Sequence, residues 1–143
     1  MAFRRLYLVI FVYFYISCLY ASNPDRNLSA RRINEEMRID GKLSEEAWEK
    51  ASSASGFTQT EPSPGLPATF ETEVHFLYDN NAIYIGARMY DPEPDKILKE
   101  LSLRDMIGNA DNFRVFLDTY KSGLNGFKFY ITASGVQYEA VTT

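Results

Sequence analysis

A polar loop at 104–112 holds the residues best suited to chemistry. It reads Arg-Asp-Met-Ile-Gly-Asn-Ala-Asp-Asn and precedes an alternating apolar stretch. Its side chains could exchange hydrogen bonds with sugar hydroxyls, and its oxygen atoms could coordinate Ca²⁺, although the spacing is not that of an EF-hand. Loops at the end of a rigid sheet often hold ligands. The same residues would also suit a turn closed by Asx hydrogen bonds, and both interpretations stay open.

Residues for covalent catalysis are scarce. The chain has one histidine, His75, and lacks a nucleophile elbow, a phosphate-binding loop and a His-Glu-x-x-His motif. Two groups of acids, at 45–46 and 91–95, could in principle hydrolyse a glycoside. The first group falls at a helix start, where the helix dipole favours acids, and the second falls in a Pro-rich loop. We therefore expect this chain not to be an enzyme.

Aromatic residues make up 15% of the chain. Tyr84, Tyr90, Phe116 and Tyr130 fall on strand faces opposite the apolar rows. An exposed aromatic ring can stack on the C–H face of a pyranose, with polar groups at the rim. The alternative is that these rings pack beneath other parts of the chain. Trp48 is expected to close one end of the core rather than to bind a sugar.

The elements that would position these residues begin with a predicted hairpin. Apolar residues alternate over 74–78 and 83–89, on either side of the polar turn Asp79-Asn80-Asn81. Aspartate and asparagine tolerate the left-handed φ that such turns need. Leu77 is an exception to the alternation, because it falls on the same face as His75.

Further strands follow the same pattern. Apolar residues alternate over 113–117 and 127–131, and a last strand over 136–142 follows a turn at 133–135. Ser44, with acids after it, predicts the start of a short helix. Together these signals predict an all-β fold, an antiparallel β-sandwich with one short N-terminal helix.

The N-terminus predicts export. Arg4 and Arg5 precede an almost entirely apolar stretch at 6–19, and Ala21 stands where a signal peptidase would cut. The stretch is short for a membrane span of about 20 residues. An uncleaved anchor and a lipidated Cys18 are the alternatives. The predicted organisation is a signal peptide at 1–21, a linker at 22–34 and a sandwich domain at 35–143, located in the periplasm, the cell envelope or the extracellular space. The polar stretch at 23–34 could instead form a first irregular strand.

Charge, cysteine content and the C-terminal stretch bear on the partners, the disulfides and the completeness of the predicted domain. The net charge of −4, with no basic stripe, argues against a nucleic-acid partner. Cys18 is the only cysteine and would leave with the signal peptide, so the mature chain would form no disulfide. The final stretch from Gly135 reads as a strand with nothing after it to cover its edge. We therefore expect the sandwich to be incomplete on its C-terminal side and the chain to be part of a longer protein.

Three blocks of sequence resemble the carbohydrate-binding modules of family 9. They are the stretch 39–48, which contains Ile-Asp-Gly-Lys-Leu and Glu-Glu-Ala-Trp, the stretch 74–87 followed by Asp91-Pro92, and the stretch 111–118, which reads Asp-Asn-Phe-Arg-Val-Phe-Leu-Asp. The chain is most similar to a subgroup in which such a module precedes a large C-terminal region predicted to be an outer-membrane barrel.

The resemblance implies binding of a polysaccharide or oligosaccharide. It also implies a link to polysaccharide catabolism through an attached region or a partner glycoside hydrolase, and in some members a structural Ca²⁺. The candidate carbohydrate-binding residues are Arg88, Arg104, Asp105, Asn109, Asp111, Arg114 and Tyr130.

The chain also departs from the family pattern. Sugar-binding relatives have a stacking tryptophan just before the third block, where this chain reads Gly108-Asn109-Ala110. The alternative function is therefore a structural N-terminal periplasmic domain of an outer-membrane protein without a sugar ligand. A related sandwich subfamily holds haem, and Met89, Met106 and His75 are present, but the chain has no haem-attachment motif.

Overall fold

The computed structural model describes residues 27–142. The predicted signal peptide, Cys18 and the start of the predicted linker lie outside these residues. The elements are β1 (Arg31–Arg32), α2 (Glu46–Glu49), β2 (Ser53–Ala54), β3 (Thr72–Tyr78), β4 (Ile83–Met89), the 3₁₀ helix η1 (Pro94–Lys96), β5 (Asn112–Leu117), β6 (Gly126–Thr132) and β7 (Gln137–Thr142). The chain divides into two compact units, one that ends at Met89 and one that begins at Tyr90.

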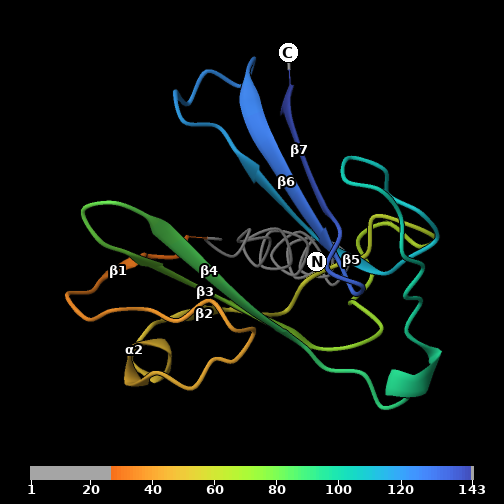
Figure 1. The fold of residues 1–143 in the computed structure, drawn as a ribbon, viewed down its shortest axis with the longest axis horizontal. Helices are drawn as coiled ribbons and strands as arrows, with labels where there is room; N and C mark the ends of the chain where they lie inside the picture. The colour runs from red at the N-terminus through yellow and green to blue at the C-terminus, as the bar shows by residue number, and fades with distance from the viewer. Residues whose placement is uncertain (1–26, 143) are drawn as a thin grey trace, which may run out of the picture. The chain divides into compact units, whose positions relative to one another are not determined.

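The first unit contains a four-stranded sheet built around β3 (Figure 1). Its partner β4 runs antiparallel along the whole of one edge. The other edge is shared by β1, which is parallel, and β2, which is antiparallel. Arg31–Arg32 and the buried Ile33 belong to this unit, so the sheet begins within the range predicted as a linker.

The β3–β4 turn is held by one carboxylate. Asp79 Oδ1 accepts hydrogen bonds from the backbone N–H groups of Asn81 (2.6 Å) and Ala82 (2.7 Å). Asp79 Oδ2 accepts a third from the Tyr84 hydroxyl, at 2.9 Å. The bond from Asn81, followed by those from Ala82 and Tyr84, holds the pKa of Asp79 below its ordinary value.

Acid is expected to weaken this turn. Because the folded pKa of Asp79 is lowered, the stability that its charge contributes is present above about pH 4 and is lost as pH falls through the folded pKa. In Asp79→Asn an amide oxygen can still accept the bonds from Asn81 and Ala82, but the charge is gone. Urea unfolding at a series of acidic pH values should therefore show a weaker pH dependence in the variant. Equal pH dependence in the two proteins would contradict the role given to the Asp79 charge in stabilising the turn.

The core of the first unit lies between α2 and one face of the sheet. Leu77 is 0% exposed and Trp48 is 6% exposed, and both belong to the same buried cluster. The helix does not use Ser44 as its cap: Glu45 is the N-cap, and its carboxylate accepts a hydrogen bond from Trp48 Nε1 at 3.1 Å. Leu77, the apparent exception to the alternation, is therefore the residue around which this core forms.

Gly86 makes room for the tryptophan. A Cβ atom at this position would lie 2.8 Å from Trp48 Cζ3 and 2.8 Å from Leu43 Cδ2. Gly86 is opposite His75 on β3, and the Trp48 ring meets the His75 ring edge-on at a centroid distance of 6.5 Å. The indole therefore packs directly on the sheet where a strand residue has no side chain.

The second unit contains a three-stranded antiparallel sheet in the order β5-β6-β7 (Figure 1). The register places Phe113 opposite Ile131 and Val115 opposite Phe129. Cross-strand partners share a face of a sheet, so these residues form an apolar face. The opposite face carries the residues that alternate with them. The strands and turns predicted for this part of the sequence are confirmed.

The all-β class is also confirmed. Strand and bridge residues account for 35% of the described residues and form two mostly antiparallel sheets, one in each unit. In the described residues α2 is the only α-helix, as the sequence predicts. No helix within 27–142 is both long and apolar enough to cross a membrane.

Candidate functional site

One face of the β5–β7 sheet combines aromatic and cationic side chains. The register sets Arg114 opposite Tyr130 and Phe116 opposite Lys128, and then Tyr130 opposite Tyr138. Because partners on neighbouring strands share a face, all five side chains stand on the same side of the sheet. We call this the aromatic face.

The rings of the aromatic face form a continuous stack. Tyr130 and Tyr138 are stacked, with centroids 5.0 Å apart and an interplanar angle of 26°. The Arg114 guanidinium carbon lies 4.7 Å from the Tyr130 centroid, within the range of a cation–π contact. Since β6 lies between β5 and β7, Arg114 and Tyr138 approach Tyr130 from opposite sides.

Phe116 extends the stack. Its ring meets Tyr130 edge-on, with centroids 5.9 Å apart, and its side chain is 62% exposed. Tyr130 and Tyr138 are half-buried, and neither hydroxyl group is hydrogen-bonded in the described part of the chain. A ligand could therefore contact the Phe116 ring, the outer face of Tyr138 and two free hydroxyl groups.

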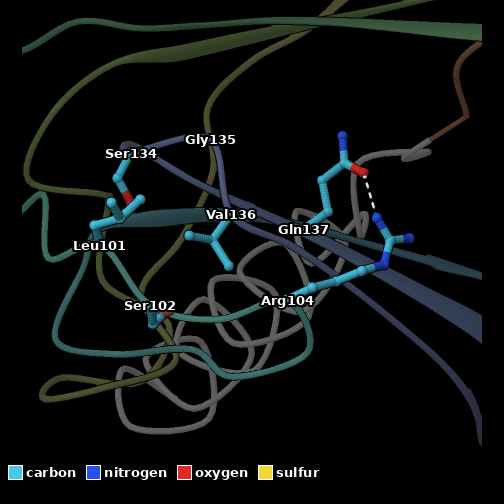
Figure 2. Close-up of a pocket in the computed structure, with 7 residues that line it drawn as sticks. All are labelled: Leu101, Ser102, Arg104, Ser134, Gly135, Val136 and Gln137. Carbon is cyan, nitrogen blue, oxygen red and sulfur yellow. Dashed lines mark hydrogen bonds between the residues drawn. The ribbon is translucent and has the colours of Figure 1, made fainter.

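A second feature is a pocket of about 300 Å³ beside the start of β7 (Figure 2). It is lined by Leu101, Ser102, Arg104, Ser134, Gly135, Val136 and Gln137. Arg104 Nη1 donates to Gln137 Oε1 at 3.0 Å, as Figure 2 shows. Its Nη2 donates to the carboxylate of Glu139, which raises the pKa of the Arg104 guanidinium.

This pocket and the aromatic face belong to opposite sides of the sheet. Gln137 and Glu139 are opposite Ile131 and Phe129, the residues of the apolar face. Arg104, which bonds to both of them, is therefore separated from the tyrosine stack by the sheet itself.

The loop that precedes β5 is closed by backbone contacts. Asp111 N donates to Leu98 O at 2.9 Å, and Asp111 Oδ2 accepts from Leu98 N at 3.0 Å. Asn109 N donates to the Glu100 carboxylate at 2.5 Å. Asp105 has a left-handed φ of 64°, and its N–H donates to Gln137 O at 3.0 Å. The carboxylate of Asp111 thus helps to hold the loop through a residue thirteen positions earlier in the chain, and not through an Asx turn.

The seven residues predicted as one site occupy several places. Arg114 and Tyr130 are brought together on the aromatic face, and Arg104 and Asp105 both contact Gln137. Asn109 and Asp111 make the loop contacts described above. Arg88 lies on β4, opposite Glu73, in the first unit.

Two of the other predicted candidates have structural contacts. Tyr84 packs against the core of the first unit and donates to Asp79. Asp91 Oδ1 accepts from Glu93 N at 2.7 Å within the Pro-rich loop. Over residues 27–142, no group of three or more His, Cys, Asp or Glu side chains is arranged to hold a metal ion.

Sequence reasoning missed Tyr138, which completes the stack. A signal for it exists: the turn at 133–135 sets the pairing of the two strands that flank it, and that pairing places Tyr138 opposite Tyr130. Gln137 and Glu139, the partners of Arg104, were missed in the same way.

The family resemblance rests on sequence blocks that the structure assigns to particular elements. The block at 39–48 includes the first residues of α2, the block at 74–87 covers most of the β3–β4 hairpin, and the block at 111–118 contains β5. Membership of the carbohydrate-binding modules of family 9 remains a prediction from these blocks, because no protein-family model, curated protein or solved structure matches the chain.

Proposed function

We propose that this chain is an exported, non-catalytic module that binds a saccharide on the aromatic face of β5, β6 and β7. The observation that carries the proposal is the stack in which Tyr130 lies between Arg114 and Tyr138, with Phe116 at its edge. Export is inferred from the apolar stretch at 6–19 behind two arginines. The module would serve polysaccharide catabolism through an attached region or a partner glycoside hydrolase.

The chemistry of the aromatic face suits a pyranose. The axial C–H groups of the sugar contact a ring, and hydroxyl groups or charged side chains at the rim exchange hydrogen bonds with the sugar. Phe116 and the outer face of Tyr138 supply rings, while the Tyr130 and Tyr138 hydroxyls and Arg114 supply polar partners. Because both faces of the Tyr130 ring are already in contact, its part is to hold Tyr138 and Arg114 in place.

Replacing Tyr138 with alanine is expected to weaken saccharide binding about tenfold, since one ring contact of this kind is worth roughly 1 kcal/mol or slightly more. Isothermal titration of the full chain with oligosaccharides, after a screen on xylan, cellulose and polygalacturonate, measures the change. Tyr120→Ala is the matched control, because Tyr120 is 82% exposed and lies outside the three strands.

Two results would overturn the proposal. Equal losses in Tyr138→Ala and Tyr120→Ala would place the site elsewhere. Absence of binding to every glycan, by a chain that melts cooperatively, would favour the alternative of a structural N-terminal domain without a sugar ligand.

A further inference from the structure

We infer that the saccharide bound on the aromatic face is anionic, with carboxylate or sulfate groups along a polymer. The inference rests on the proposed function and adds the chemical class of the ligand. Arg114 and Lys128 are the charged side chains that β5, β6 and β7 place on this face, and both are cations.

The single acid of these strands is on the other side. Glu139 is opposite Phe129 in the register, so it belongs to the apolar face, where it pairs with Arg104. Within the three strands, the aromatic face therefore carries cations alone, on a chain whose net charge is −4.

Both cations of the aromatic face are available to a ligand. Arg114 Nε donates to Asn112 Oδ1 at 2.5 Å, and neither Arg114 nor Lys128 forms an ion pair within residues 27–142. Arg104 contrasts with them, because its guanidinium is already bonded to Gln137 and Glu139.

The guanidinium of Arg114 is also held in one orientation. The bond to Asn112 uses Nε, and the contact with the Tyr130 ring restrains the plane. The two terminal nitrogens are left for a carboxylate or sulfate, which an arginine can bind through two parallel hydrogen bonds. An orientation set before binding reduces the entropy that binding must overcome.

The spacing of the two cations suits a polymer rather than one small anion. Lys128 is two residues from Tyr130 along β6, so it is the diagonal neighbour of Arg114, and such positions are about 7–8 Å apart. Charged groups repeated along a sugar chain could meet both side chains, while the sugar rings contact Phe116 and Tyr138.

The arrangement of charge also distinguishes an anionic polysaccharide from single-stranded nucleic acid, which is another polyanion that stacks on aromatic rings. Proteins that bind single-stranded nucleic acid combine stacking platforms with an extended positively charged groove. Here the three strands supply two cations and no extended basic groove, on a chain with an isoelectric point near 5.0. Single-stranded DNA therefore serves as a competing ligand in the test.

The test compares two forms of one polymer. Polygalacturonate with free carboxylates should bind the full chain at least fivefold more tightly than the same polymer with its carboxylates methyl-esterified. Arg114→Gln and Lys128→Gln should each weaken binding of the free acid by about threefold to fivefold, the range expected for an exposed charge pair. Lys99→Gln, which removes a charge outside the three strands, is the matched control and should change nothing.

Each outcome has a distinct meaning. Higher ionic strength should weaken binding of the free acid and leave the methyl ester unaffected. If dextran sulfate binds and polygalacturonate does not, with the same losses in the variants, the anionic class stands and sulfate is the group recognised. Equal affinity for the free acid and the ester, lost in Tyr138→Ala, would overturn this inference and leave saccharide binding intact. Tighter binding of oligothymidylate than of any glycan would overturn both, and so would no binding at all.

Discussion

Replacing Trp48 with alanine is expected to lower the free energy of unfolding of the first unit by about 3–5 kcal/mol. The indole is 6% exposed, packs in the same cluster as Leu77 and lies against the sheet at Gly86. The substitution removes this burial and leaves a cavity between α2 and β3. It also leaves the Glu45 carboxylate without its indole partner.

Urea unfolding followed by circular dichroism measures this effect. Trp48 is the only tryptophan, so its fluorescence cannot be compared between the two proteins. Phe70→Ala is the matched control: it removes an aromatic ring that is 45% exposed in the same unit and should cost much less. Equal losses in the two variants would show that the core does not depend on the indole.

Replacing Gly86 with alanine is expected to cost about 1–3 kcal/mol, because the new methyl group overfills a packed site. The added carbon would lie 2.8 Å from both Trp48 Cζ3 and Leu43 Cδ2, which is closer than real Cβ contacts allow. The indole is rigid and buried, so it cannot move away as the end of a flexible side chain could.

A double-mutant cycle tests the cause of that loss. In a Trp48→Ala background the ring is absent, so the same glycine substitution should cost less than about 1 kcal/mol, and the difference is the coupling between the two positions. A loss of the same size in both backgrounds would mean that the contact with Leu43, and not the contact with the indole, makes glycine necessary there.

The five longer strands of this protein, β3 to β7, could be predicted from local sequence. Alternation over 113–117 and 127–131 and the polar turn at 79–81 depend on neighbours along the chain, and the structure forms strands and a hairpin at these places. The short helix at Trp48 was predicted for the same reason. The predicted N-cap, Ser44, was wrong, because Glu45 takes that position. The Glu45 carboxylate accepts a hydrogen bond from the Trp48 indole and none from the helix backbone.

The role of Leu77 could not be predicted in this way. Alternation assigns it to a polar face with His75, yet it is the most buried residue of the first unit. What makes that face apolar is α2, which contacts β3 and supplies Trp48 from a distant part of the sequence. A pattern within one strand contains no information about what will cover it.

For the candidate site too, local sequence determined one part and tertiary structure determined another. The residue types were evident from the sequence: arginines, acids and amides near 104–114 and aromatic residues on alternating strand faces. Only the tertiary structure decided their grouping, because strand register sets Arg114 beside Tyr130 and Tyr138 and places Arg104 with Glu139 on the opposite side. A sheet separates its two faces completely, so residues ten positions apart in the chain can be unable to contact one ligand. Local sequence thus determined the elements and their chemistry, and long-range pairing determined which of these residues can act together.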